Sequence, residues 1–463
     1  MLTYDVVVIG GGTAGSNAAR ASAREGAKTL MIRGLDLLNT CVEEGCMPSK
    51  SFLASTRKGM KWEEALKIKD EHIVRLYKAL EGGLENEKFD IIKGEARFKT
   101  PGELLVKAED GKSKVVQAKR FVIATGSTPF VPNIEGAKDL TPSTELLVSD
   151  DLVGKNSRLK NPPKRVLIVG GGPIGLECAT ILHQAGSKVM VVEMADRLLP
   201  AFDPEFGEER LRFADDTEGF DIILSATLRS LRKESDGIVC HFECRDCAGE
   251  TTVDAVLIAT GRKANLDGLD LEKAGLLVER GRPVHDEKTL ETSIPNIFVA
   301  GDVVGHNQIV HYAAEMGIVA GARAANPSSE KEMDWDKLSM GVSFDAASSA
   351  VIGMTEGEAH TRGYQTVSSI AHFNSIGKGI LTQQKHGMWK LTSERGSGKI
   401  LGSQIIGPEI AGELIQILSP ILYYEGTVSD VMKMTWYHPT FGEILKSLAK
   451  DICGQFSSLC PGM

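Results

Sequence analysis

The chain has 463 residues, which is too long for one hydrophobic core, so two to four domains are expected. Its composition is that of an ordinary globular protein, and no apolar run approaches the roughly 18–20 residues of a membrane span. A net charge of −9 argues against a nucleic-acid partner. The opening residues MLTYDVVVIGGG show no secretion signal, which predicts a cytoplasmic protein without a membrane partner.

Residues 5–32 show the pattern of an apolar strand, a glycine turn, a helix of small residues and a second apolar strand. Gly10, Gly12 and Gly15 have the spacing that lets the backbone approach a dinucleotide pyrophosphate. The helix N-terminus supplies free N–H groups and a positive dipole end for the phosphates. This stretch therefore predicts a Rossmann-like dinucleotide-binding unit.

The stretch TCVEEGCMPSK, residues 40–50, places Cys41 and Cys46 five apart at the expected start of a helix. In a cytoplasmic protein, paired cysteines are usually catalytic, redox-active or metal-binding rather than structural. The helix dipole is expected to lower the pKa of a thiol at its N-terminus. Glu43 and Glu44 stand between the cysteines, and two carboxylates beside a thiolate are expected to raise its pKa.

Residues 165–193 repeat the first pattern about 160 residues later, with Gly170, Gly172 and Gly175 in the turn. A single motif could be an ordinary glycine turn, but two copies in the same context predict two bound dinucleotides. Glu193 follows the second strand, where an acid can bind both ribose hydroxyls of NAD and repel the extra phosphate of NADP. The same offset in the first copy gives Arg33.

Three further apolar strands, in residues 121–126, 256–261 and 294–302, each end in a turn of small residues. Such turns are expected where the edge of a strand passes a cofactor, and the candidate contacts are Thr125, Gly126, Ser127 and Gly261. Asp302 can accept hydrogen bonds from polyol hydroxyls, although Gly-Asp is also a common turn.

From about residue 335 the glycine fingerprints end, and short strands lead into amphipathic helices, which predicts a third, α+β domain. Near the end, Glu443 lies five residues after His438. A lone histidine is more often structural, but a histidine beside a carboxylate is the arrangement of an oriented general base.

The remaining cysteines have less specific patterns. Cys240, Cys244 and Cys247 lack a second ligand pair for a metal knuckle, so a surface hairpin is favoured and no metal site is predicted. For Cys453 and Cys460 two interpretations stay open, an electron-relay pair and incidental tail thiols.

Taken together and in order, these motifs resemble the class I pyridine nucleotide-disulfide oxidoreductases over essentially the whole chain. The resemblance implies an α/β protein with two Rossmann-like domains, for FAD and NAD, and a C-terminal α+β dimerisation domain. The implied limits are 1–150 for the first part of the FAD domain, 151–280 for the NAD domain, 281–335 for the return to the FAD domain, and 336–463 for dimerisation. The implied assembly is a homodimer with active sites shared across the interface.

The resemblance also assigns roles to the dithiol and the histidine. Cys41 and Cys46 would form a reversible disulfide beside the flavin, with Cys46 as the flavin-side thiolate and Cys41 exchanging with the substrate. His438 matches the base that serves the partner subunit's site, and Glu443 matches the acid that orients it.

Three more residues belong to the flavin side of this implied site. Lys50 matches a lysine that favours negative charge on the reduced flavin, and Glu177 matches the acid that pairs with it. The alternative for Glu177 is a solvated helix residue. Thr40, directly before the first cysteine, is included among the expected cofactor contacts.

Within the family, the chain looks most like dihydrolipoamide dehydrogenase, as a divergent branch, because Glu193 favours NAD and the His-Glu pair is kept. The implied substrate is a dithiol, best matched by a protein-bound dihydrolipoyl group or a small dithiol. The alternatives are another NAD(P)H-dependent disulfide reductase, a mercuric reductase-like enzyme, and a non-catalytic flavoprotein redox sensor. Arg33 departs from the ribose-binding glutamate that the family usually has, so either Asp36 substitutes or FAD is held without that contact.

Overall fold

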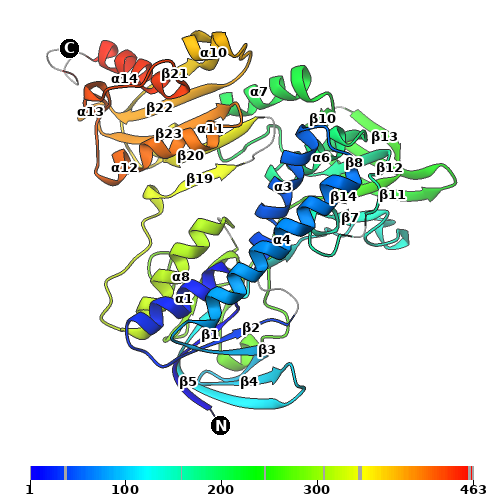
Figure 1. Ribbon diagram of the computed structural model, residues 1–463, viewed down its shortest axis with the longest axis vertical. Helices are drawn as coiled ribbons and strands as arrows, with labels where there is room; N and C mark the ends of the chain where they lie inside the picture. Colours follow the sequence, from blue (N-terminus) through cyan, green and yellow to red (C-terminus); the bar gives the residue numbers. More distant parts are fainter. Residues whose placement is uncertain are drawn as a thin grey trace.

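The computed structural model describes residues 2–35, 39–157, 159–244, 247–305, 308–342, 347–456 and 460. Three regions separate in Figure 1: an N-terminal α/β unit at the bottom, a second unit at the upper right and a C-terminal domain at the upper left. In the part of the chain so described, no helix combines the length and the apolar character that a membrane crossing requires.

The first unit begins with β1 (Leu2–Ile9), α1 (Thr13–Arg24) and β2 (Thr29–Arg33). The two strands are parallel, with Ile9 opposite Ile32, which confirms the predicted βαβ pattern. All five residues of β2 are buried, and this explains why its sequence is a continuous run rather than an alternation of polar and apolar residues.

Four further elements complete the first unit. β3 (Asp90–Thr100) pairs parallel to β2 and then antiparallel to β4 (Glu103–Ala108), which pairs with β5 (Ser113–Ile123). β5 runs beside β1, and β18 (Ile297–Val299) returns from far along the chain to pair parallel with β5. The carboxyl ends of β1, β5 and β18 therefore meet at one edge of the sheet, where cofactor sites of open α/β sheets form.

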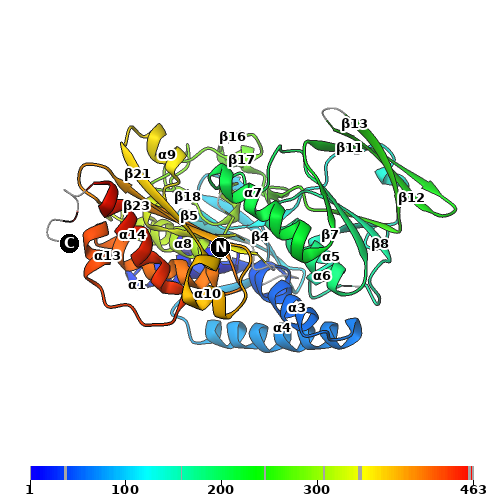
Figure 2. The same cartoon turned by 90° about the horizontal axis from the view of Figure 1, so that it is seen from above.

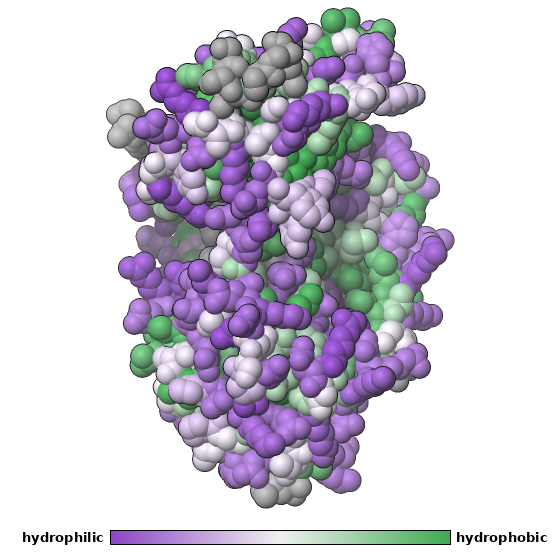
Figure 3. Space-filling view, turned by 90° about the vertical axis from the view of Figure 1, so that its left-hand side faces the viewer, coloured by the Kyte–Doolittle hydropathy of each residue, from purple (hydrophilic) through white to green (hydrophobic). Residues whose placement is uncertain are grey.

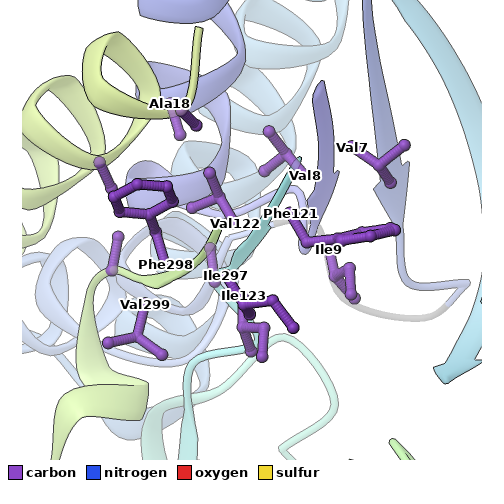
Figure 4. Packing of buried hydrophobic residues seen from close by; sticks show 14 of the residues in the cluster. Val7, Val8, Ile9, Ala18, Phe121, Val122, Ile123, Ile297, Phe298 and Val299 are labelled. Atoms are coloured by element: carbon purple, nitrogen blue, oxygen red, sulfur yellow. The ribbon is translucent and has the colours of Figure 1, made fainter. Parts of the chain in front are cut away.

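Buried side chains hold these three strands together (Figure 4).

α8 (Val310–Ala325) packs against α1, and the contact is close because two residues of α8 are glycines. A Cβ atom at Gly317 or Gly321 would overlap backbone carbonyl oxygens of α1. The labelled core residues come from β1, α1, β5 and β18: Val7, Val8, Ile9, Ala18, Phe121, Val122, Ile123, Ile297, Phe298 and Val299.

Three helices follow β2: α2 (Thr40–Glu43), α3 (Cys46–Arg57) and α4 (Trp62–Glu85). α4 lies alongside α3 and extends from the first unit to the second in both views (Figures 1 and 2). Near its C-terminal end, Leu84 belongs to the core of the first unit.

The N-terminal part of α4 is attached to the connection between the two units. The indole N–H of Trp62 donates to the carbonyl oxygen of Leu159 at 3.0 Å. The ammonium of Lys69, which is fully buried, donates to the carbonyl oxygen of Gly154 at 2.8 Å. One helix therefore contacts both units.

The second unit has a parallel sheet in the order β10-β9-β8-β14-β7. Its strands are β7 (Leu146–Val148), β8 (Arg165–Val169), β9 (Lys188–Val192), β10 (Asp221–Ile223) and β14 (Ala255–Ile258). This arrangement confirms the second predicted βαβ pattern, because β8 and β9 flank a helix and pair in parallel.

Smaller elements surround this sheet. An antiparallel meander of β11 (Ala226–Glu234), β12 (Gly237–Cys244) and β13 (Cys247–Val253) covers one face. The helix between β8 and β9 is α6 (Pro173–Gln184), and α5 (Ser149–Val153) follows β7.

Two connections join the first unit to the second, and the predicted domain limits near them stay a prediction. β7 pairs with β14, so the chain enters the second sheet before residue 151. On the return, Leu269 and Leu271 already belong to the first core, before residue 281. Backbone pairing and side-chain burial, rather than a change in composition, thus mark where each unit ends.

The C-terminal domain is an antiparallel sheet in the order β19-β20-β23-β22-β21. Its strands are β19 (Ser339–Val342), β20 (Ser348–Gly353), β21 (Thr366–His372), β22 (Met388–Glu394) and β23 (Ile400–Gly407). Helices pack on this sheet, which confirms the predicted α+β domain. They are α9 (Glu356–Thr361), α10 (Gly377–Leu381), α11 (Ala411–Leu414), α12 (Leu418–Tyr423), α13 (Val428–Lys433) and α14 (Ile444–Gln455).

A buried ion cluster joins this domain to the second unit. The ammonium of Lys390 on β22 lies 2.9 Å from Asp203 and 2.6 Å from Glu205, at the start of α7 (Pro204–Phe213). Between the C-terminal domain and the first unit the surface is instead hollowed. Figure 3 shows this hollow on the face that looks left in Figure 1, with the C-terminal domain above it and the first unit below.

Candidate active site

The first glycine turn forms a tight cradle at the carboxyl end of β1. Gly10 has a φ of +119°, and a Cβ atom there would overlap the carbonyl oxygen of Ala124 at the end of β5. A Cβ atom at Gly15 would overlap the carbonyl oxygen of Gly10, and Gly12 is the N-cap of α1. The turn can therefore pack this closely against β5 and α1 only because these positions are glycine, and a glycine turn before a helix N-terminus fits a dinucleotide pyrophosphate such as that of FAD.

The second glycine turn has the same construction. Gly170 has a φ of +113°, and a Cβ atom at Gly175 would overlap its carbonyl oxygen. Gly172 is the N-cap of α6. The carboxylate of Glu193 accepts hydrogen bonds from the amides of Gly171 at 2.6 Å and Ala195 at 2.7 Å. The acid is thus fixed beside the turn, as a ribose-binding acid of an NAD site needs to be.

The predicted contacts that follow β5 and β18 bond each other directly, and Arg262, which was not selected from the sequence, adds a further bond to this pair. The hydroxyl of Ser127 donates to Asp302 at 2.7 Å, and the guanidinium of Arg262 donates to Ser127 at 2.8 Å. Arg262 directly follows Gly261 in the turn after β14. Its place beside a predicted cofactor contact was the feature of the sequence that could have identified it. The hydroxyl of Thr125 donates to the carbonyl oxygen of Asn265 at 2.6 Å, which fastens the same two turns.

The two cysteines lie at a break between two helices. Cys41 is in α2, and Cys46 is the first residue of α3, as predicted from their spacing. Asn39 caps α2, because its side-chain oxygen accepts from the amide of Val42 and its amide donates to Thr13 at the start of α1. This capping places the cysteine pair beside the first glycine turn.

The two thiols are reduced in this structure and differ in acidity. The pKa of Cys46 is lowered to about 7, because the thiol of Cys41 donates a hydrogen bond to it and Lys50 adds a positive charge, against the effect of burial. The pKa of Cys41 is raised by the same hydrogen bond and by burial. The pair therefore loses its first proton at Cys46, which is the form a flavin-side thiolate requires.

Lys50 and Glu177 are brought together across the two units. The ammonium of Lys50 on α3 donates to Glu177 on α6 at 2.7 Å, and Glu177 is buried. The other carboxylate oxygen accepts from the hydroxyl of Ser49 at 3.0 Å. A solvated Glu177 is thereby ruled out. Ser49 was not selected from the sequence, since nothing local shows that it faces a helix 128 residues away.

The expectation that Glu43 and Glu44 raise the pKa of the thiolate is wrong. Glu43 is buried and pairs with Lys155 at 2.6 Å, while its second oxygen accepts from the amide of Asn39 at 2.8 Å. Its charge is thus paired with a lysine from a distant segment, and the pKa of Cys46 is lowered rather than raised, with Cys41 as the largest cause. Glu44 has its own pKa raised to about 7, by burial first and then by Asp150.

At the end of β2, Arg33 is buried and its guanidinium donates to Glu81 on α4 at 2.8 Å. The alternative acid, Asp36, lies outside the described residues. The position that was expected to hold an acid therefore holds an ion pair between β2 and α4.

His438 and Glu443 form a hydrogen-bonded pair at 2.7 Å, and Glu443 also accepts from the amide of Thr440. The histidine side chain is 74% exposed. In Figures 1 and 2, α13 and α14, which flank this pair in the chain, lie in the C-terminal domain and are separated from the start of α3 in both views. The structure thus does not bring the pair to the cysteines of its own chain.

The other cysteines have structural positions. Cys240 is buried in the core between the second sheet and the meander, and Cys244 lies opposite Cys247 at the end of the β12–β13 hairpin, as expected for a hairpin. Cys453 and Cys460 are joined by a disulfide in the C-terminal core, so they are a bonded pair, and a part in electron relay stays a prediction. Within the described ranges no cluster of three or more histidine, cysteine or acidic residues could hold a metal ion.

The structure has two dinucleotide cradles, a dithiol at the edge of the first cradle and a lysine–glutamate pair between the two units. This combination defines a class of protein, the flavin- and nicotinamide-dependent dithiol oxidoreductases. Comparison with known proteins gives the same result. Residues 4–317 match the pyridine nucleotide-disulphide oxidoreductase family, and residues 340–449 match the dimerisation domain of that family.

Relatives with similar sequences cover nearly the whole chain. A dihydrolipoyl dehydrogenase of Thermus scotoductus is 32% identical over 98% of both chains. One from Vibrio cholerae is 31% identical over 98% of this chain and 96% of its own. Among solved structures, the Cu(II) complex of the HOCl-induced flavoprotein disulfide reductase RclA from Escherichia coli has a TM-score of 0.85 at 25% identity, over 97% of this chain and 99% of its own.

The chain belongs to the pyridine nucleotide-disulphide oxidoreductase family. It is an FAD- and NAD-dependent oxidoreductase with a C-terminal dimerisation domain, which confirms the predicted fold class, enzyme class and cofactors. That domain exposes aromatic side chains, and Tyr423, Tyr424 and Tyr437 are each more than 60% exposed in the isolated chain. Aromatic residues are enriched at protein interfaces, in agreement with a homodimer.

Proposed function

We propose that this enzyme oxidises a dithiol, most specifically a dihydrolipoyl group on a carrier protein, with NAD as the final electron acceptor. The observation that carries the proposal is the hydrogen-bonded, exposed pair of His438 and Glu443, which is suited to a thiol substrate that must lose protons. The relatives named dihydrolipoyl dehydrogenase, at about 30% identity, support the same substrate class. The cytoplasm and the carrier protein are parts of this proposal.

In this proposal the cysteine pair exchanges electrons with the substrate. A substrate thiolate attacks Cys41 of the oxidised pair, the Cys41–Cys46 bond breaks, and Cys46 leaves as a thiolate. The second substrate thiolate then attacks the mixed disulfide, so the substrate leaves as a disulfide and Cys41 leaves as a thiolate. Bound FAD supplies the chemistry that takes the electron pair from the dithiol and passes it to NAD.

His438 removes the protons of the substrate thiols, and Glu443 keeps its ring oriented through the bond to Nδ1. Because the pair lies away from the cysteines of its own chain, we assign it to the site of the partner subunit. Lys50 and Glu177 provide a neutralised, hydrogen-bonded charge pair beside the dithiol.

The cofactor contacts in this proposal follow the two cradles. For FAD they are Gly10, Gly12, Gly15, Thr40, Lys50, Thr125, Gly126, Ser127 and Asp302. For NAD they are Gly170, Gly172, Gly175, Glu193 and Gly261.

A second candidate is an NADH-consuming reductase, and the specific support is the structural likeness to RclA, a flavoprotein disulfide reductase described as a Cu(II) complex. One set of steady-state rates separates the two candidates. Dihydrolipoamide with NAD is compared with glutathione disulfide, Cu(II) and mercuric ion, each with NADH and with NADPH. The first candidate is supported if dihydrolipoamide with NAD gives the highest kcat/KM, and it is rejected if dihydrolipoamide is not turned over while another acceptor is.

A further inference from the structure

The two cradles share one backbone register, which identifies Arg33 and Glu193 as equivalent positions. In the first unit the amide of Gly10 donates to the carbonyl oxygen of Ile32 at 2.8 Å, and Arg33 follows. In the second unit the amide of Gly170 donates to Val192 at the same distance, and Glu193 follows. Arg33 therefore occupies the place from which an acid reaches the adenosine ribose of a bound dinucleotide.

An arginine at this place has no carboxylate that could bind the ribose, but it forms an ion pair with a residue that has one. Its side chain is 6% exposed and pairs with Glu81, whose side chain is 37% exposed. Burying a guanidinium without a counter-charge would be costly, so the ion pair fixes Glu81 at the end of β2. The carboxylate is the more accessible partner of the two.

The contacts of Glu81 leave one of its oxygens available. The guanidinium of Arg33 and the phenol of Tyr77 both donate to Oε1, at 2.8 and 3.2 Å. Among the described residues, Oε2 has no hydrogen-bond partner. Two donors on one oxygen orient the carboxylate, and the second oxygen is left as an acceptor beside the first cradle.

We propose that Glu81, held by Arg33 and Tyr77, is the acceptor for the adenosine ribose hydroxyls of FAD. The acid that this site needs is thus Glu81 on α4. Arg33, which stands at the end of β2 where the second unit has Glu193, positions it. The proposal does not depend on which dithiol or disulfide the enzyme uses, since it concerns only the binding of FAD.

The test is a chemical comparison on the apoprotein, made by removing FAD and titrating it back while flavin fluorescence is followed. The two probes are FAD and an FAD analogue whose adenosine ribose lacks the 2′-hydroxyl. The wild-type protein is expected to bind FAD about tenfold or more tightly than the analogue, the usual effect of a hydrogen bond to a charged group. The Glu81→Gln variant is expected to bind the two probes within about twofold of each other, because a neutral amide is the weaker acceptor.

Glu64→Gln is the matched control, since Glu64 is an exposed acid on the same helix. It should keep the wild-type Kd for both probes. The ratio of the two Kd values within one protein is independent of the fraction that is folded, so instability of a variant cannot imitate the result.

A charge reversal, Arg33→Glu with Glu81→Arg, tests the positioning role. It returns an acid to the end of β2 beside a cation on α4, and preference for FAD over the analogue should reappear. If Glu81→Gln keeps the full preference for FAD, the proposal is wrong. If Arg33→Lys loses that preference while Glu81→Gln keeps it, the arginine itself contacts the ribose and the proposal is also wrong.

Discussion

The two dinucleotide units begin from the same backbone plan and provide an acid in different ways. In the second unit Glu193 extends from the end of its own strand and is fixed by two backbone amides. In the first unit the equivalent residue is a buried arginine, and the carboxylate that pairs with it, Glu81, is on α4, 48 residues further along the chain. The comparison teaches that backbone register is set locally by glycines, whereas the charge at a binding site can be supplied by any element that packs there.

The units also differ in what lies beside the cradle. The first has the cysteine pair at the start of α3, and the second contributes Glu177 to the charge pair with Lys50. We therefore expect substitutions at the dithiol to separate the two half-reactions, with losses confined to the exchange with the substrate.

The largest effect is expected for Cys46→Ser. Loss of one thiol prevents formation of the disulfide, so turnover of the dithiol substrate should fall on the order of 10³-fold or more. Reduction of the flavin by NADH in a stopped-flow experiment should stay within a few-fold of the wild-type rate, because it uses the second cradle. Equal loss in both measurements would contradict the separation of the two units.

His438→Ala should lower kcat/KM for the dithiol on the order of 10²–10⁴-fold, the usual contribution of one acid–base group. Flavin reduction by NADH is again the control that should not change.

Mixed dimers give a sharper result. When one subunit carries His438→Ala and the other Cys46→Ser, one of the two sites is intact, and about half of the wild-type activity should return. Mixed dimers without activity would show that His438 serves its own chain.

Glu193→Ala should weaken NAD binding about tenfold and reduce the preference over NADP, because the carboxylate that repels the extra phosphate is gone. The measurement is KM for both nucleotides, with retained FAD as the control for the first unit. An unchanged NAD to NADP ratio would mean that another residue sets the preference.

The smallest effect concerns the acidity of Cys46. A lowered pKa of about 7 means that its thiolate is present above that pH and is lost as the pH falls through it. Titration of thiolate absorbance in the reduced enzyme should show a midpoint near 7. Lys50→Met should move that midpoint upward, because the lysine charge favours the thiolate. A midpoint that does not move would assign the lowered pKa to the hydrogen bonds that Cys46 accepts from Cys41 and from the backbone.

Much of the molecule could be predicted from local sequence patterns. Both βαβ units, the helix start at Cys46 and the α+β domain follow from spacing and periodicity over short stretches, and so does the pairing of His438 with Glu443. Contacts between distant segments could not be predicted in the same way. Glu43 was expected to perturb a thiolate, yet its partner Lys155 is 112 residues away. Ser49 and Arg262 were missed for the same reason, since their partners lie on other elements.

The helix α4 has a consequence for engineering this protein. It has 24 residues, so it is about 36 Å long, and it contacts Leu159 and Gly154 near one end and Arg33 near the other. A chimera that replaces the second unit by cutting at residue 151 would separate α4 from both of its buried backbone acceptors. The exchangeable module therefore has to leave residues 154–159 with the first unit, and recombination libraries cut after this segment should yield more folded members than those cut before it.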